Sequence, residues 1–179
     1  YKEVGRLSAE VKSLPWGAQA IGKAPMRLSH STMHIIGLGR IGKEVAVRAR
    51  GNGLKVTAYD PYVSAEEMSS CGVIKTEWEQ GLAMADYISV NCILNDETTG
   101  LIKYDDFKKM KPSACLINTA RGKVIDEAAM VRALDEGLIR GAMLDVIEVE
   151  PPAYSEKIFE CKNAHVTPHV SYISVQSFE

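Results

Sequence analysis

A glycine-rich stretch, Gly-Leu-Gly-Arg-Ile-Gly at residues 37–42, is the feature that most constrains the fold of this chain. A short apolar run precedes it, a helical pattern follows it, and Asp60 comes about 20 residues later, after a second apolar run. A strand, a tight glycine turn, a helix and a distant acid in this order are typical of a dinucleotide-binding site. A glycine-rich loop of an unrelated α/β protein is the alternative, and the surrounding pattern argues against it.

Each of the three glycines, and Asp60, has an expected role in a dinucleotide-binding site. Gly37 permits the tight turn, Gly39 lets a pyrophosphate approach the backbone, and Gly42 lets the helix lie close to the first strand. The helix N-terminus offers free N–H groups and a partial positive charge to phosphates. We expect Asp60 to accept hydrogen bonds from both ribose hydroxyls and to repel a 2′-phosphate, so the sequence predicts NAD and not NADP.

Composition excludes several classes of partner. The chain has 179 residues, 46% hydrophobic and 25% charged, with a net charge of −2 and no basic cluster, which argues against nucleic-acid or membrane-surface binding. No apolar run reaches the ~18 residues of a membrane span, and no signal peptide is visible. The cysteines lack metal-site or paired spacing, so we expect reduced thiols, no metal and a cytoplasmic location. They are Cys71, Cys92, Cys115 and Cys161.

Apolar runs alternate with helical patterns through the rest of the chain, which predicts a mainly parallel, doubly wound sheet of Rossmann type with helices on both faces. Expected strands cover residues 34–36, 54–59, 73–74, 86–92, 114–118, 142–146 and 164–166. Expected helices cover residues 1–13, 40–51, 64–71, 77–84, 104–110 and 126–136. On the helix after the glycine turn, Ile41, Val45 and Ala49 share one face.

Three polar residues near the predicted carboxyl ends of strands form a coherent chemical set: Arg121, Glu150 and His169. A guanidinium can hold a carboxylate with two hydrogen bonds and polarise a neighbouring carbonyl. A histidine can donate the proton when a ketone becomes an alcohol, and an adjacent carboxylate would keep it protonated. Considered one at a time, Arg121 could belong to a surface ion pair, Glu150 could be a solvated loop acid, and His169 could be a structural histidine. Their joint position downstream of the glycine turn favours the catalytic interpretation.

Further motifs extend the pattern. They are Tyr-Asp-Pro-Tyr at 59–62, Asn-Thr-Ala-Arg-Gly at 118–122, Val-Ile-Asp-Glu at 124–127, Gly-Ala-Met-Leu-Asp-Val at 141–146, Glu-Pro at 150–151 and Thr-Pro-His at 167–169. With the glycine turn, they resemble the NAD-binding domain of the D-isomer-specific 2-hydroxyacid dehydrogenases. The resemblance implies that Arg121 binds the substrate carboxylate, that Glu150 pairs with His169 as the acid/base, and that Asp145 lies near the nicotinamide amide.

The expected NAD contacts are Gly37, Gly39, Arg40, Ile41, Gly42, Asp60, Pro61, Asn91, Cys92, Thr119, Ala120, Asp145 and His169. Two departures from the family are visible: Ile93 stands where Pro is frequent, and residues 171–174 are larger than usual. The second leaves the substrate class open among phosphoglycerate dehydrogenase-like, glyoxylate/hydroxypyruvate reductase-like and formate dehydrogenase-like members.

The resemblance also implies a domain layout. Residues 1–17 would be a crossing helix from a substrate domain, residues 18–170 the cofactor domain, and residues 171–179 the start of the return to the substrate domain.

We expect an NAD-dependent oxidoreductase that moves hydride between nicotinamide C4 and C2 of a small 2-keto or 2-hydroxy acid. We expect it to be a homodimer. This chain alone would bind NAD with little turnover. The alternative is an NAD-sensing corepressor similar to the C-terminal binding proteins. An epimerase is disfavoured, because no Tyr-x-x-x-Lys pair stands at the place where such an enzyme needs it.

Overall fold

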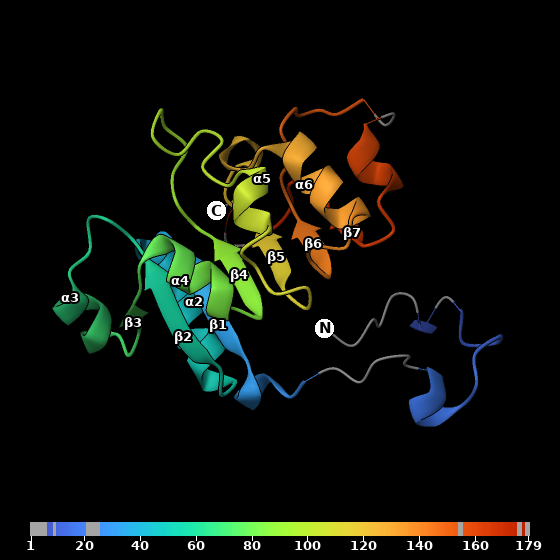
Figure 1. Cartoon of the computed structure of the whole chain (residues 1–179), viewed down its shortest axis with the longest axis horizontal. Helices are drawn as coiled ribbons and strands as arrows, with labels where there is room; N and C mark the ends of the chain where they lie inside the picture. The colour runs from blue at the N-terminus through green and yellow to red at the C-terminus, as the bar shows by residue number, and fades with distance from the viewer. Residues whose placement is uncertain (1–6, 9, 21–25, 154–155, 175–176, 178–179) are drawn as a thin grey trace.

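The structure, a computed structural model, describes residues 7–8, 10–20, 26–153, 156–174 and 177. The described residues form one sheet of seven parallel strands in the order β3-β2-β1-β4-β5-β6-β7 (Figure 1). The strands are β1 (Thr32–Ile36), β2 (Lys55–Tyr59), β3 (Ile74–Lys75), β4 (Tyr87–Val90), β5 (Cys115–Asn118), β6 (Gly141–Leu144) and β7 (Ala164–Val166). The strand order reverses between β1 and β4, the position where such sheets bind ligands. The predicted doubly wound sheet is confirmed.

The helices between the strands begin where the sequence offers caps. Ser64 Oγ accepts the Glu67 N–H at 3.1 Å, and Asp126 Oδ1 accepts the Ala129 N–H at 2.9 Å. The α-helices are α2 (Arg40–Gly51), α3 (Ala65–Ser70), α4 (Trp78–Met84), α5 (Tyr104–Phe107) and α6 (Glu127–Asp135). Short 3₁₀ turns are η1 (Gly17–Ala20), η2 (Leu28–His30), η3 (Gly122–Val124) and η4 (Lys157–Glu160).

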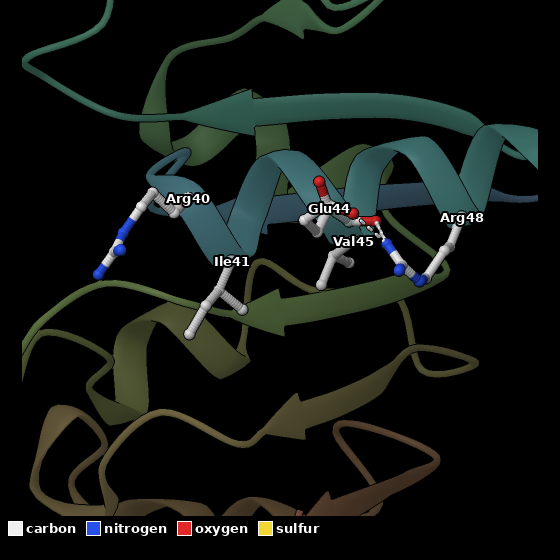
Figure 2. Close-up of a pocket in the computed structure, with 5 residues that line it drawn as sticks. All are labelled: Arg40, Ile41, Glu44, Val45 and Arg48. Atoms are coloured by element: carbon white, nitrogen blue, oxygen red, sulfur yellow. Dashed lines mark hydrogen bonds and ion pairs between the residues drawn. The ribbon is translucent and has the colours of Figure 1, made fainter. Parts of the chain in front are cut away.

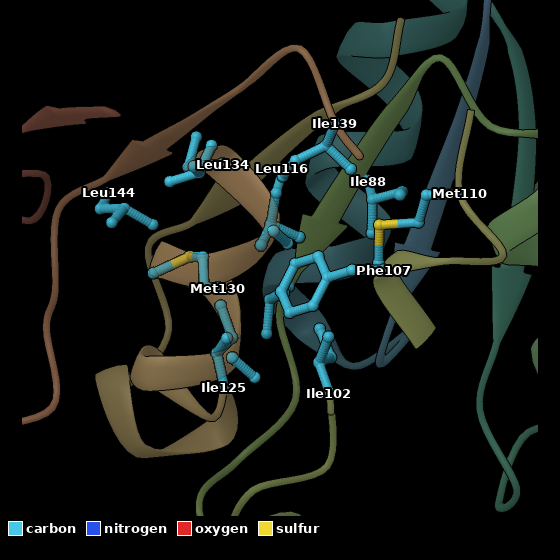
Figure 3. Close-up of a cluster of buried hydrophobic side chains, with 14 of the residues drawn as sticks. Ile88, Ile102, Phe107, Met110, Leu116, Ile125, Met130, Leu134, Ile139 and Leu144 are labelled. Atoms are coloured by element: carbon cyan, nitrogen blue, oxygen red, sulfur yellow. The ribbon is translucent and has the colours of Figure 1, made fainter. Parts of the chain in front are cut away.

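The sheet carries a separate hydrophobic cluster on each face. Successive residues of a strand point to opposite faces, and in β1 Ile35 belongs to one cluster and Ile36 to the other. The α2–α3 cluster consists of Ile35, Leu38, Ala46, Ala49, Leu54, Val56, Ala58, Met68 and Val73. Figure 3 shows the cluster on the opposite face, where Phe107 of α5 and Met130 of α6 pack beside Leu116 of β5. Each fully buried side chain of this size contributes roughly 1.5–3 kcal/mol to stability.

One helix face and one helix end differ from the prediction. On α2 the buried residues are Gly42, Ala46 and Ala49, whereas Ile41 is 67% exposed. The face without bulky side chains turns to the sheet, because Gly42 packs against the glycine turn. Helix α5 ends at Phe107 instead of 110.

The helix expected over residues 1–13 falls largely outside the described residues. Leu7, Ser8 and Glu10 are helical, and residues 11–13 form a turn. Within the described part of the chain, every helix is too short or too polar to cross a membrane.

Candidate functional site

The glycine turn is held by close backbone contacts with two neighbouring elements. Gly37 has a φ of +88°, and a Cβ on it would lie 2.6 Å from the Cys92 nitrogen that follows β4. A Cβ on Gly42 would lie 2.2 Å from the Gly37 carbonyl oxygen. The Gly37 N–H also donates to the Tyr59 carbonyl oxygen at 3.0 Å. No larger residue fits at either glycine without moving backbone, which confirms their predicted roles in the turn and in helix packing.

Gly39, the middle glycine of the turn, faces open space and does not pack against backbone. A Cβ on Gly39 would meet no atom within 4 Å, and Gly39 is the N-cap of α2 with no side-chain cap. Figure 2 shows Arg40 and Ile41 at this end of α2, at one end of a surface cavity of about 390 Å³. The uncapped helix N-terminus and the missing Cβ together leave the backbone accessible to an anionic group. These residues therefore fit a pyrophosphate.

Asp60 joins the glycine turn to the end of β2. Its Oδ2 accepts the Leu38 N–H at 2.8 Å, and its Oδ1 accepts the Tyr62 N–H at 2.9 Å, with Pro61 exposed between them. Each carboxylate oxygen can accept a further hydrogen bond, so the group is oriented and still able to bind ribose hydroxyls.

Asn91 and Cys92 follow β4 on the other side of the glycine turn. Asn91 Nδ2 donates to Ser89, while Asn91 Oδ1 is buried and has no hydrogen-bond partner among the described residues. Burial raises the pKa of the Cys92 thiol to about 11, and the nearby Asp60 charge acts in the same direction. Cys92 is therefore a neutral packing residue at the turn and not a nucleophile.

Arg121 ends a turn, residues 118–121, that a buried asparagine organises. Asn118 Oδ1 accepts the Ala120 N–H at 3.0 Å, and Asn118 Nδ2 donates to the Arg121 carbonyl oxygen at 2.9 Å. Thr119 and Arg121 are exposed. The Arg121 guanidinium donates to the Ala120 carbonyl oxygen at 2.7 Å and is otherwise open to solvent. It can therefore reach an anionic ligand.

Glu150 and His169 form a hydrogen-bonded pair. Glu150 Oε2 lies 2.6 Å from His169 Nδ1, and Glu150 Oε1 accepts the Ile147 N–H at 3.1 Å. His169 has a φ of +53°, a left-handed conformation that is unusual for a residue with a Cβ. Tyr172 packs edge-on against the imidazole at 5.7 Å between ring centroids. The predicted pairing of this acid with this histidine is therefore present.

Asp145 holds the His169 loop, residues 167–171. Its carboxylate accepts hydrogen bonds from Thr167 Oγ1 at 2.5 Å, from Val170 N–H at 3.0 Å and from Ser171 N–H at 2.8 Å. Burial would raise its pKa, but the hydrogen bonds from Thr167, Ser171 and Val170 outweigh burial and lower the pKa to about 2. The carboxylate stays ionised and fixes the loop that presents His169. Its expected contact with the nicotinamide amide stays a prediction.

The structure thus brings two of the three expected catalytic side chains into contact. Arg121 touches neither Glu150 nor His169 directly, but its segment packs on theirs, because a Cβ on Gly122 would lie 1.8 Å from the Ile147 carbonyl oxygen. No group of three or more His, Cys, Asp or Glu side chains among the described residues could hold a metal ion.

Comparison with known proteins gives the family. The family model for the D-isomer specific 2-hydroxyacid dehydrogenase, NAD binding domain, matches residues 1–171. The chain belongs to this family. NAD is therefore the cofactor of this NAD-binding domain, in agreement with the accessible glycine turn and the oriented Asp60.

Relatives of the NAD-binding domain are dehydrogenases and reductases. D-3-phosphoglycerate dehydrogenase of Bacillus subtilis is 40% identical over 170 residues, covering 94% of this chain and 32% of that protein. Glyoxylate reductase of Thermococcus litoralis is 38% identical over 174 residues, covering 94% of this chain and 52% of that protein. D-lactate dehydrogenase from Aquifex aeolicus, solved with NAD and lactic acid, is 34% identical with a TM-score of 0.89, covering 99% of this chain and 57% of that chain. The NAD-binding domain thus spans about a third to just over half of these relatives.

Sequence reasoning missed two polar residues that build the site. Asn118 and Thr167 belong to the recognised motifs but have no predicted role, and in the structure Asn118 holds the segment of Arg121 while Thr167 helps to hold the segment of His169. The position of Asn118 at a strand end, just before an irregular segment, was the available signal, because Asn side chains readily hydrogen-bond backbone in turns.

Proposed function

We propose that the whole protein to which this chain belongs is an NAD-dependent oxidoreductase that interconverts a 2-keto acid and a D-2-hydroxy acid. The observation that carries this proposal is the 2.6 Å contact between Glu150 Oε2 and His169 Nδ1 on an NAD-binding domain. Reduction of a ketone needs a proton at the carbonyl oxygen, and an oriented imidazole can supply it near neutral pH. The names of the relatives support the same reaction class.

His169 is the acid/base in this proposal. Its Nδ1 faces Glu150, so Nε2 is the ring nitrogen that exchanges a proton with the substrate oxygen. Glu150 is held in turn by the Ile147 N–H, which fixes the orientation of the imidazole.

Arg121 binds the substrate carboxylate. Its exposed guanidinium can form two parallel hydrogen bonds with a carboxylate and thereby orient the neighbouring carbonyl towards His169. Gly122 and Asn118 keep this segment close-packed, so the orientation costs little flexibility on binding. When bound, NAD supplies or accepts the hydride at nicotinamide C4.

In this proposal, the residues that contact NAD lie at the carboxyl ends of the strands. The backbone at Gly37 and Gly39 and the start of α2 hold the pyrophosphate, and Asp60 holds the adenosine ribose. The remaining contacts come from residues that follow β2, β4, β5 and β6 or begin α2: Arg40, Ile41, Pro61, Asn91, Cys92, Thr119, Ala120 and Asp145. An ionised Asp60 disfavours a 2′-phosphate, so NAD is preferred to NADP.

The domain layout and assembly belong to the same proposal. Residues 18–170 act as the cofactor domain, and residues 1–17 and 171–179 connect to a substrate domain. The protein is a cytoplasmic homodimer; the four free thiols agree with a reducing compartment. The corepressor alternative stays a prediction, because its peptide groove would lie on another domain.

The test is steady-state reduction by the full-length protein with NADH and a panel of 2-keto acids: pyruvate, glyoxylate, phenylglyoxylate and 3-phosphohydroxypyruvate. We expect turnover with at least one of them. The H169A variant should lose about 10²–10⁴-fold in kcat, because it lacks the proton donor, while its NADH affinity stays nearly unchanged. Undiminished turnover by H169A would remove His169 from the mechanism.

A further inference from the structure

The Val-Ile-Asp-Glu motif at residues 124–127 contains an acid whose role the proposed reaction does not explain. Asp126 caps α6, whereas the Glu127 side chain forms its hydrogen bond outside the helix. Its half-buried carboxylate crosses to the segment after β6, where Oε2 accepts the Glu148 N–H at 2.9 Å. Glu148 lies two residues before Glu150.

The segment of residues 147–150 has no helix or strand of its own, so a few contacts determine its conformation. The first is the close approach of Gly122 to the Ile147 carbonyl, and the second is the Glu127–Glu148 hydrogen bond. The third is internal, from the Ile147 N–H to Glu150 Oε1. Both external contacts come from the stretch that begins at Arg121 and ends at the start of α6.

We propose that Glu127 is a positioning residue: by accepting the Glu148 N–H, its carboxylate fixes the segment that holds Glu150 against His169. This inference rests on the proposed function. Glu127 touches no reacting group, so it acts only through the backbone of residues 147–150. Because Gly122 follows Arg121 directly, the same contacts also fix the distance between the carboxylate-binding group and the acid/base pair.

If the hydrogen bond from the Glu148 N–H to Glu127 fixes the segment, substitution of Glu127 by Gln and by Ala should have different effects. Gln keeps a side-chain oxygen that can accept the Glu148 N–H, whereas Ala leaves that N–H without its acceptor. When the segment loosens, Glu150 no longer holds His169 Nδ1, and the imidazole loses the orientation that proton transfer requires. A displacement of about 1 Å at such a pair is enough to slow a reaction by one to two orders of magnitude.

The experiment compares E127A, E127Q and E136A in the full-length protein, with NADH and the best 2-keto acid of the panel. Glu136 is the control, since it is a carboxylate at the opposite end of α6, where it accepts hydrogen bonds from Arg132 and Tyr104. We measure kcat, KM, the pH–rate profile and NADH affinity. E127L, which keeps side-chain bulk without an acceptor, replaces E127A if that variant does not fold.

We expect E127A to lose about tenfold in kcat, with KM within about twofold of the parent value and NADH affinity unchanged. E127Q should retain kcat within about twofold, and E136A should behave as the parent protein. A parent-like kcat for E127A, or equal losses in E127A and E127Q, would overturn the inference. H169A measured alongside separates the two proposals: if it loses turnover while E127A does not, only the role of Glu127 fails.

Discussion

The cofactor half and the acid/base half of the site are built in different ways. In the cofactor half, Gly37 and Gly42 bring backbone into contact with backbone, and no side chain fits between. In the acid/base half, two buried polar side chains hold the chain by hydrogen bonds: Asn118 bonds the turn that carries Arg121, and Asp145 accepts the N–H groups of residues 170 and 171, which lie far from it in sequence. The first half therefore depends on side chains being absent, and the second depends on particular side chains being present.

This difference determines what each half tolerates. Adding a methyl group breaks a backbone-to-backbone contact, because carbonyl and amide groups cannot move aside as a flexible side chain can. Removing a buried acceptor breaks the other half, because the donors it served stay buried without a partner. Each half should thus be sensitive to a change that the other would survive.

The largest effect is expected from G42A. The added Cβ would lie 2.2 Å from the Gly37 carbonyl oxygen, so α2 must move off β1, at a cost of about 4 kcal/mol in the free energy of unfolding. Urea unfolding of the chain measures the loss. G39A is the matched control, because its Cβ meets no atom within 4 Å. G39A should keep the parent stability and lose NADH affinity; equal stability of the two variants would contradict this view of the turn.

His34 lies in β1, the strand that leads into the glycine turn, and should make stability depend on pH. It is fully buried, Nδ1 lies 3.0 Å from Thr57 Oγ1, and a Cβ on Gly81 would lie 2.2 Å from its ring. Burial lowers its pKa from the ordinary 6.5 to about 4. The folded chain thus keeps His34 neutral while the unfolded chain protonates it, so stability is full above about pH 6.5 and falls as the pH drops towards 4.

The loss amounts to about 3 kcal/mol over this interval. Urea unfolding at a series of pH values measures it, and H34L should remove this part of the pH dependence. H30Q is the control, because His30 is exposed. A parent chain whose stability is flat between pH 6.5 and 4 would show that His34 is not buried in this way.

D145N tests the acid/base half. The variant loses the charge that accepts the Val170 and Ser171 N–H groups, so the chain should lose about 2 kcal/mol at pH 7. The lowered pKa of Asp145, about 2, means that its contribution is full above about pH 4 and is lost as the pH falls towards 2. D135N, on the exposed end of α6, should change stability by less than about 0.5 kcal/mol. Equal stability of D145N and D135N would contradict the role of Asp145 in holding the loop.

The two halves also differ in how far the sequence predicts them. The glycine turn and the strands are local patterns, and the structure confirms them. The exposure of Ile41 was not predictable from helical periodicity, because the Gly42 packing decides which face of α2 turns inward. Asn118 bonds residues two and three positions later, so its place at a strand end was a usable local signal. The role of Asp145 depends on which distant N–H groups need an acceptor, and only the folded chain shows that.

The smallest effect concerns cofactor choice. D60N removes the charge at the end of β2, which should weaken NADH binding about tenfold, by loss of charge-assisted hydrogen bonds to ribose, and should improve NADPH binding. Calorimetric titration of the chain with each cofactor measures both effects. D96N is the matched control, because it removes the same charge from the exposed loop after β4. The parent chain should bind NADH tightly and NADPH weakly.

This titration also separates two functions of Asp60. Its oxygens accept the Leu38 and Tyr62 N–H groups at 2.8 and 2.9 Å, so the residue could serve the turn alone. If so, D60N weakens NADH and NADPH equally and lowers stability. If it also selects the cofactor, the two affinities move in opposite directions while D96N changes neither. Only opposite changes in the two affinities would show that the Asp60 side chain selects NADH over NADPH. Asp60 would then be a required side chain in the cofactor half, where Gly37 and Gly42 are required because they lack one.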